Sequence, residues 1–205
     1  IAIILGLIIL LTVCGLYFKN IHNITEENDG NVDKIKSVNL STDYEIDQAM
    51  IDIESLKVNT VNVPVVIEIP MLTSNEMKIN EYSKEKAIEL IKKLKSSNIN
   101  VILELYPWIN NGSDYETEFD PEDKNKFFED WKCILGKLID EIANKYDVDI
   151  IITASNLTKL ESYQDEWIDI IEYVKKNLMV LLHIKHHGGI RQSGMKKALI
   201  NIMKS

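Results

Sequence analysis

The sequence predicts an α/β protein with parallel strands, preceded by a transmembrane helix. Two observations support this: strand and helix patterns alternate four times after residue 35, and the first 18 residues carry no charge. Repeated βα units build either a (β/α) barrel or an open, doubly wound sheet. No glycine-rich turn of the kind that cradles phosphates follows any of the strands. We therefore favour a TIM barrel, of which this chain would hold about four and a half of the eight βα units.

The N-terminal residues 1–18, IAIILGLIILLTVCGLYF, are apolar and are followed by Lys19. A run of this length can cross a bilayer, so we expect a single-pass signal anchor. Residues 19–34 are polar and acidic without an apolar period, and they predict a linker. The domain at residues 35–177 is then expected at the cell membrane, on the extracytoplasmic side. The segment before Cys14 also loosely resembles a lipoprotein signal.

Composition limits the classes of ligand. The net charge is -9, with lysines and acidic residues interspersed, which argues against nucleic acid and favours neutral polar ligands. The two cysteines, Cys14 and Cys133, form neither a disulfide framework nor a zinc spacing. The acidic residues 114–123 are an alternative calcium site, but they lack the EF-hand spacing. We therefore expect no cofactor and no metal.

The first two βα units are predicted from capping residues and apolar stripes. Residues 35–40 predict a short strand, and residues 42–45 a capping box that begins a helix. Residues 60–69 predict a β-branched strand that ends in Glu68, and Ser83 is expected to cap the next helix. The apolar stripes of the two helices are Ile46, Ala49, Met50, Ile53 and Leu56, and then Ala87, Leu90, Ile91 and Leu94.

The third and fourth units follow the same order. Residues 101–105 predict a fully buried strand, and Asp120 followed by Pro121 predicts a helix start. Residues 148–153 predict the fourth strand. The stripes of the two helices are Phe127, Phe128, Trp131, Leu135, Leu138 and Ile142, and then Trp167, Ile170, Ile171 and Val174.

A carboxylate and two aromatic residues come together after the third strand. The run at 101–105 includes Glu104 and leads directly into Tyr106 and Trp108. Ligands bind at the carboxyl ends of strands in α/β folds, and an aromatic ring beside a carboxylate suits a sugar, whose C–H face stacks while its hydroxyls are held. The alternative is that both rings pack under a loop.

Residues 36–176 resemble the amino-terminal half of a clan-A (β/α)8 glycoside hydrolase, nearest to the family 113 β-mannanases and their clostridial relatives. The resemblance rests on the segments VNVPVVIEI, VILELYPWINNGSDYETEFDP, FFEDW and TASNLTKLESYQDEWIDIIEYV. It implies a polysaccharide or oligosaccharide as the partner, such as β-mannan, and O-glycosyl hydrolysis as the activity.

The resemblance also implies roles for individual residues. Retaining hydrolases of this clan use a glutamate at the end of strand four, usually after an Asn, and a second one at strand seven, roughly 5 Å apart. Here Asn156 matches, but Leu157 stands where the glutamate is expected. Glu161 is the nearest substitute as catalytic residue, with an exposed carboxylate at a helix start as the alternative. The strand-seven nucleophile is not found in this chain, and a non-catalytic glycan-binding protein stays open.

Several further residues are expected to bind substrate rather than react with it. Glu68 and Glu104 lie at strand ends, where the alternative is a salt bridge with a lysine. Tyr115, Glu116 and Glu118 lie on the loop after the third strand and could line subsites. The complete expected substrate-binding set is Glu68, Glu104, Tyr106, Trp108, Asn110, Asn111 and Asn156.

Residues 178–205 differ in character from the rest. They hold three of the four histidines and no acidic or aromatic residue. A metal site at His183, His186 and His187 is one interpretation, although it lacks an acidic partner. A frameshift near codon 177 or 178 is our preferred hypothesis, because residues 186–190, back-translated and read one base earlier, become Thr-(Ser or Pro)-Trp-Trp-Tyr. We therefore expect a truncated product without hydrolase activity.

Overall fold

The structure is a computed structural model that describes residues 34–178. The predicted anchor, most of the linker and the histidine-containing tail lie outside these residues. Within residues 34–178, none of the helices has the length and apolar character needed to span a bilayer.

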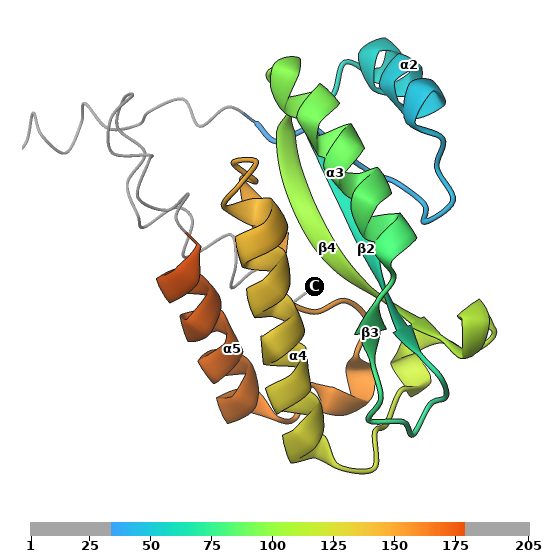
Figure 1. The fold of residues 1–205 in the computed structure, drawn as a ribbon, viewed down its shortest axis with the longest axis vertical. Coiled ribbons are helices and arrows are strands. Elements are labelled where there is room, and N and C mark those ends of the chain that lie inside the picture. The colour runs from blue at the N-terminus through green and yellow to red at the C-terminus, as the bar shows by residue number, and fades with distance from the viewer. Residues whose placement is uncertain (1–33, 179–205) are drawn as a thin grey trace, which may run out of the picture. The chain divides into compact units, whose positions relative to one another are not determined.

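The described residues form a parallel α/β sheet with helices between its strands (Figure 1). The parallel strands are β1 (Ser37–Asn39), β2 (Thr60–Ile69), β4 (Asn100–Ile109) and β5 (Ile150–Ile152), in that spatial order. The helices are α2 (Ile46–Leu56), α3 (Glu81–Ser96), α4 (Lys124–Leu138) and α5 (Gln164–Asn177). This is the predicted order of four βα units, and it is consistent with part of a TIM barrel.

The two faces of the central strands have different roles. β2 and β4 pair in register from Thr60 with Asn100 to Ile69 with Ile109, so residues side by side share a face. Along β4 the odd-numbered residues are buried and the even-numbered ones are partly exposed from Ile102 onward. The apolar stripe of α3 is fully buried in the same core, and α3 runs along β2 and β4 (Figure 1). The helices therefore cover the odd-numbered face of β4.

The third strand is longer than predicted. β4 continues to Ile109 rather than ending at Leu105, and it alternates between buried and half-buried residues rather than being fully buried. The reason is non-local, because β2 is equally long and pairs with β4 over all ten residues. Tyr106 and Trp108 consequently lie inside the strand rather than after it.

Pro64 of β2 and Pro107 of β4 fit in the central strands because the strand beside each of them ends before it reaches the proline. Even-numbered residues of β2 direct their backbone N–H and C=O groups toward β1. For example, the carbonyl of Asn62 accepts a hydrogen bond from Leu40 N–H at 3.2 Å. Pro64 has this orientation beyond the end of β1, so its missing N–H breaks no ladder bond. Odd-numbered residues of β4 direct their backbone N–H and C=O groups toward β5. Pro107 is one of them and lies beyond the end of β5, so its missing N–H likewise breaks no ladder bond.

The helix starts differ from the predictions at α2 and α3. α2 begins after Glu45, whose side chain makes no capping hydrogen bond, so the predicted capping box is wrong. α3 is capped by Asn80, whose side chain accepts from Ser83 N–H at 2.8 Å. Ser83 lies inside the helix, and its hydroxyl instead accepts from Val66 N–H at 2.9 Å. Ser83 therefore ties α3 to the β1 side of β2.

The start of α4 is set by a contact between loops. Asp123, not Asp120, caps the helix by accepting from Lys126 N–H at 3.0 Å. Residues 119–122 are held away from the helix because Asp120 N–H donates to Leu72 O at 2.8 Å and Glu122 N–H to Thr73 O at 3.0 Å. Sequence reasoning could not detect these bonds, which join segments almost fifty residues apart.

Aromatic residues of the FFEDW segment belong to the core. Trp131 is fully buried, and its indole N–H donates to Thr153 O at 2.8 Å. Phe127 stacks on Trp131 with ring centroids 5.6 Å apart, and Phe128 contacts Trp167 of α5 edge-on at 5.0 Å. These rings attach α4 and α5 to each other and to the sheet. Leu56, by contrast, is exposed rather than part of the buried stripe of α2.

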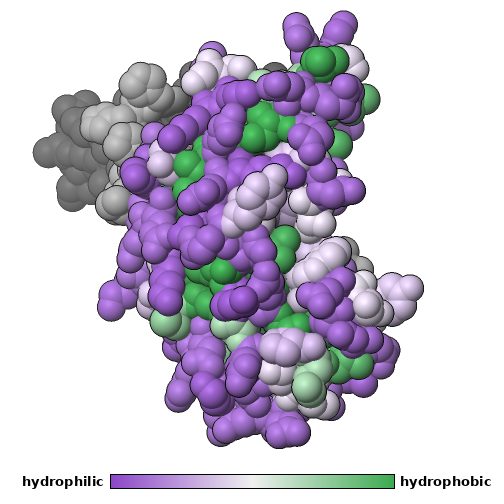
Figure 2. Space-filling model, turned by 45° about the vertical axis from the view of Figure 1, so that its right-hand side comes forward, coloured by the Kyte–Doolittle hydropathy of each residue, from purple (hydrophilic) through white to green (hydrophobic). Residues whose placement is uncertain are grey.

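The surface visible in Figure 2 is mostly hydrophilic, with separate small hydrophobic patches. Large apolar side chains that are exposed come from dispersed places in the chain. They are Ile35, Ile51, Leu56, Met71, Tyr82, Tyr115 and Ile168.

Candidate functional site

A row of half-buried side chains, among them residues predicted to bind substrate, lies on the sheet face opposite the helices. Glu104, Tyr106 and Trp108 occupy successive even positions of β4, between buried neighbours. Glu68 of β2 pairs in register with Trp108. We call this surface the open face and define it by the residues Asn62, Glu68, Glu104, Tyr106 and Trp108.

Glu104 is held by an amide rather than by a lysine. Asn62 Nδ2 donates to Glu104 Oε2 at 2.5 Å across the two central strands. Asn62 is only 3% exposed, and sequence analysis did not identify it. A signal was present, since an asparagine in a β-branched strand is unusual. The lysine salt bridge considered as an alternative for Glu104 does not occur within the described residues.

Glu68 does have a lysine partner. Lys78 of β3 (Lys78–Ile79), a short antiparallel strand that was not predicted, forms an ion pair with Glu68 at 2.9 Å. Asn80 Nδ2 donates to the other carboxylate oxygen at 2.5 Å. The Lys78 hydrogen bond and, second, the Asn80 hydrogen bond lower the pKa of Glu68. The Glu68 side chain stays 33% exposed, so the ion pair leaves it accessible to a ligand.

Tyr106 is a hydrogen-bond donor at physiological pH. Burial and, second, its hydrogen bond to Glu116 raise the pKa of Tyr106 to about 12. The charges of Glu116 and Glu104 add to this effect. The rings of Tyr106 and Trp108 are tilted at 45° with centroids 6.2 Å apart. The two rings are therefore neighbours on one face.

Trp108 lines a cavity of about 590 Å³ at the carboxyl end of β2 and β4. That volume is in the range of small-molecule sites, and the wall combines apolar and charged groups. The lining residues are Glu68, Ile69, Pro70, Glu76, Met77, Lys78, Trp108 and Asn111.

The turn after β4 packs closely against the Trp108 ring. Gly112 has φ +78°, and a Cβ there would lie 2.4 Å from Cζ2 of the Trp108 indole. Asn110 and Asn111 also have positive φ, 50° and 52°, a conformation that asparagine tolerates better than most residues. Both are exposed, and Asn111 reaches the cavity. The backbone conformation of the turn therefore explains in part why asparagine occupies positions 110 and 111.

Glu68 and Glu104 are too far apart to react as a pair. Glu104 is in register with Pro64, four residues before Glu68, which corresponds to roughly 13 Å along the strand. A retaining glycosidase requires carboxylates at roughly 5 Å. These two glutamates can accept hydrogen bonds at separate positions, but they do not form a retaining catalytic pair.

Asn156 and Glu161 lie after β5 and away from regular structure. Asn156 is exposed with φ 56°, and its carbonyl accepts from Thr158 N–H at 2.9 Å. Glu161 is exposed and follows the 3₁₀ turn Thr158–Leu160; its side chain forms no hydrogen bond or ion pair with residues 34–178. The catalytic role of Glu161 stays a prediction.

The acidic loop after β4 has local partners. Glu118 pairs with Lys159 at 3.1 Å and Asp120 with Lys124 at 2.6 Å, while Asp123 caps α4. In the part of the chain that the structure describes, no group of three or more His, Cys, Asp or Glu residues is arranged to hold a metal ion. Cys133 is an exposed thiol on α4.

The comparisons agree on the class of fold. The family model described as Cellulase (glycosyl hydrolase family 5) matches residues 24–187. No curated protein matches the sequence. The solved structures that match include a GH113 β-1,4-mannanase, with a TM-score of 0.59 and 18% identity over 70% of this chain and 52% of that chain.

Two further solved structures are similar. One is a complex of a GH113 β-1,4-mannanase, with a TM-score of 0.54 and 18% identity over 66% of this chain and 48% of that chain. The other is the GH113 β-mannanase of Alicyclobacillus acidocaldarius in complex with ManMIm, with a TM-score of 0.56 and 12% identity over 64% and 45%. This chain therefore spans about half the length of the structures it matches, and at these identities the likeness concerns the fold.

Proposed function

The chain belongs to the cellulase family, glycosyl hydrolase family 5, and from this premise we propose that it binds a neutral polysaccharide such as β-mannan. The predicted membership of a clan-A glycoside hydrolase close to family 113 is confirmed by the family match and the mannanase folds. The glycan, the linkage and the membrane attachment are parts of the proposal.

The row of Glu104, Tyr106 and Trp108 on one strand face carries this proposal. An indole and a phenol ring beside carboxylates match the two sides of a sugar, its apolar C–H face and its hydroxyl groups. The cavity beside Trp108 has room for about one or two sugar rings. Glu68 and Asn111 line this cavity, and Asn110 and Asn156 are the further residues of the proposed substrate-binding set.

The described residues support binding better than hydrolysis. Glu68 and Glu104 are separated by roughly 13 Å along the strands. Glu161 is proposed as the acid/base in the alternative that the protein is an active hydrolase. For this chain we propose glycan affinity without turnover, at the extracytoplasmic side of a membrane that residues 1–18 would enter.

A second candidate is a non-catalytic glycan-binding or cell-envelope protein of the same fold. The observation that favours it is Leu157, which follows Asn156 where the clan places its acid/base glutamate. The exposed position of Glu161 after a 3₁₀ turn favours it as well.

Binding and turnover separate a glycan-binding protein from an active hydrolase. The full chain is titrated with soluble β-1,4-mannohexaose by isothermal titration calorimetry, and released reducing sugar is measured in parallel. We expect binding that Trp108→Ala abolishes, and no reducing sugar. Reducing sugar that Glu161→Gln eliminates would establish the enzyme instead, and absence of affinity for any polysaccharide of a broad panel would refute the proposal.

A further inference from the structure

Two glutamates in the wall of the cavity beside Trp108 differ in their surroundings. Glu68 uses both of its carboxylate oxygens, since Lys78 pairs with one at 2.9 Å and Asn80 Nδ2 donates to the other at 2.5 Å. Glu76 lines the same cavity, and its carboxylate forms no hydrogen bond or ion pair within the part of the chain that the structure describes. Glu76 is therefore the less occupied acceptor of the two.

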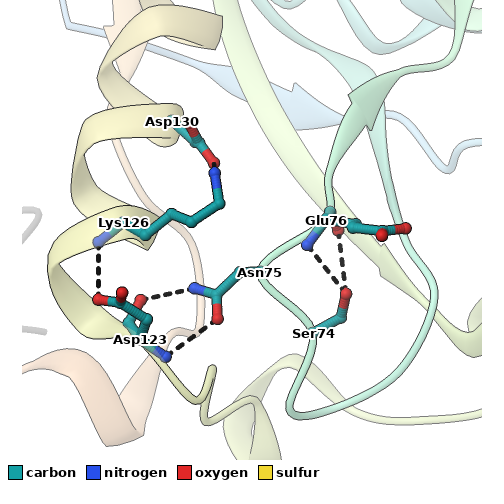
Figure 3. A network of polar contacts seen from close by, with 6 residues as sticks. All are labelled: Ser74, Asn75, Glu76, Asp123, Lys126 and Asp130. Carbon is teal, nitrogen blue, oxygen red and sulfur yellow. Dashed lines mark hydrogen bonds and ion pairs between the residues drawn. The ribbon is translucent and has the colours of Figure 1, made fainter.

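The backbone of Glu76 is fixed by a turn, although its side chain has no partner among the described residues. Glu76 N–H donates to Ser74 Oγ at 2.9 Å, and the Ser74 hydroxyl donates to Glu76 O at 3.5 Å. Serine commonly stabilises turns by such bonds to the backbone nearby. Figure 3 shows the Glu76 carboxylate directed away from Ser74 and Asn75. The turn thus holds Glu76 in place and leaves its carboxylate available.

The tip of the loop between β2 and β3, residues 70–77, is attached to the segment before α4. Figure 3 shows Asn75 joined to the backbone of Asp123 by two hydrogen bonds: Nδ2 donates to Asp123 O at 2.5 Å, and Oδ1 accepts from Asp123 N–H at 2.9 Å. Two backbone N–H groups of residues 119–122 donate to carbonyls of the same loop at 2.8 and 3.0 Å. Asn75 is the side chain in this attachment, and it directly precedes Glu76.

The base of the same loop is held by the sheet. β3 pairs antiparallel with the end of β2, and Asn80 N–H donates to Val66 O at 2.9 Å. Met77, next to Glu76, is partly buried, packs against the hydrophobic core and also lines the cavity. A group on a loop held at both ends is pre-organised, so a ligand that binds there loses little free energy to ordering.

The chemistry of this wall suits a neutral ligand rich in hydroxyl groups. An ionised carboxylate accepts at about four lone-pair positions and donates none, so the Glu76 carboxylate fits hydroxyl donors. The cation of the cavity wall, Lys78, already pairs with Glu68 and is not left for an anionic ligand. The Trp108 ring in the same wall supplies an apolar surface for the C–H face of a sugar.

We propose that Glu76 is a glycan-binding residue that accepts hydrogen bonds from sugar hydroxyls in the cavity, and that Asn75 is a positioning residue that holds the β2–β3 loop for it. This inference rests on the proposed function and adds to it a contact on the side of the cavity formed by the loop.

The test uses the full chain, β-1,4-mannohexaose and calorimetric titration. In Glu76→Gln we expect affinity to fall about fivefold, the difference between a hydrogen bond to a charged group and one to a neutral amide. Glu122→Gln removes the same charge from an exposed residue that does not line the cavity, so this matched control should bind like the wild type. Trp108→Ala tests the proposed function separately, and near-UV circular dichroism checks that each variant is folded.

A double-mutant cycle tests the role of Asn75. We expect Asn75→Ala to weaken binding several-fold, and the double variant with Glu76→Gln to bind little worse than Asn75→Ala alone, because both changes remove one interaction. Asn144→Ala is the control for a general loss of stability, since Asn144 donates to Asn177 O at 3.0 Å and does not line the cavity; it should bind like the wild type. Purely additive losses would overturn the positioning role.

The outcomes for Glu76 and for the proposed function are distinguishable. Wild-type affinity in Glu76→Gln, together with lost affinity in Trp108→Ala, would overturn the role of Glu76 and leave the proposed function intact. An equal loss in Glu122→Gln would also overturn it, because the effect would then come from net charge and not from a contact. If the wild type binds no glycan, both proposals fall.

Discussion

Asn62 and Glu104 form a hydrogen bond across the two central strands, with Nδ2 of the amide 2.5 Å from Oε2 of the carboxylate. Asn62 is almost fully buried, and its Oδ1 has no hydrogen-bond partner in the described residues. The Asn62 amide therefore binds Glu104 through its nitrogen while its buried oxygen is left without a hydrogen bond, which lowers its net contribution to stability. It fixes the carboxylate orientation on the open face.

Substituting Asn62 should reveal this dependence. We expect Asn62→Ala to lower the free energy of unfolding by about 1–2 kcal/mol, because the charged hydrogen bond is lost while water can still reach the half-buried Glu104. Asn62→Asp should cost more at neutral pH, since two carboxylates would then face each other. Urea denaturation measures both. Equal stability of the two variants would contradict this account.

The Glu68–Lys78 pair predicts a pH effect at acidic values. The folded pKa of Glu68 is lowered below its ordinary value of 4.5, so its contribution to stability is present above 4.5 and is lost as the pH falls through the folded pKa. In Lys78→Met the Glu68 pKa should rise toward 4.5, because the lysine hydrogen bond is the largest cause of its lowering. Carboxyl ¹³C NMR titration follows this directly. Lys78 is exposed, so the effect on stability should be small.

Gly112 should be required for the position of Trp108. Gly112→Ala introduces a Cβ at 2.4 Å from the indole and a side chain at φ +78°. We expect a loss of about 1–2 kcal/mol in stability from the left-handed backbone alone, together with a shifted tryptophan emission as the ring is displaced. Asn111→Gly is the control, since glycine accepts its φ of 52° without strain. An unchanged emission spectrum in Gly112→Ala would show that the turn does not hold the ring.

Sequence patterns predicted the local part of this fold correctly. β2 has the predicted bounds, and Ala87, Leu90, Ile91 and Leu94 are all fully buried, because β-branched runs and helical spacing are local signals. The extension of β4 to Ile109 could not be predicted in this way, since it depends on pairing with β2.

In the candidate site, too, local features could be predicted from the sequence and non-local contacts could not. Glu104, Tyr106 and Trp108 were recognisable as a group because they gather at the end of one predicted strand, whereas their common face follows from the extension of β4 to Ile109. Asn62 was not singled out, because its contact with Glu104 crosses a strand pair. Likewise α4 is capped by Asp123 rather than by the predicted Asp120, because the residues before Asp123 bond to a distant loop.

The open face should discriminate between neutral and anionic glycans. Glu104 has no ion-pair partner within residues 34–178, and the chain as a whole carries a net charge of -9. A uronate would bring a further negative charge next to Glu104, whereas a neutral sugar brings only hydroxyl donors. At low ionic strength we expect hexagalacturonate to bind at least about tenfold more weakly than mannohexaose, and added salt to narrow the gap by screening the repulsion. Glu104→Gln should narrow the gap as well, by weakening the binding of the neutral ligand and relieving the repulsion of the anionic one. Calorimetric titration of both ligands at two salt concentrations provides the comparison. Equal affinities at low salt would mean that Glu104 does not face the bound sugar.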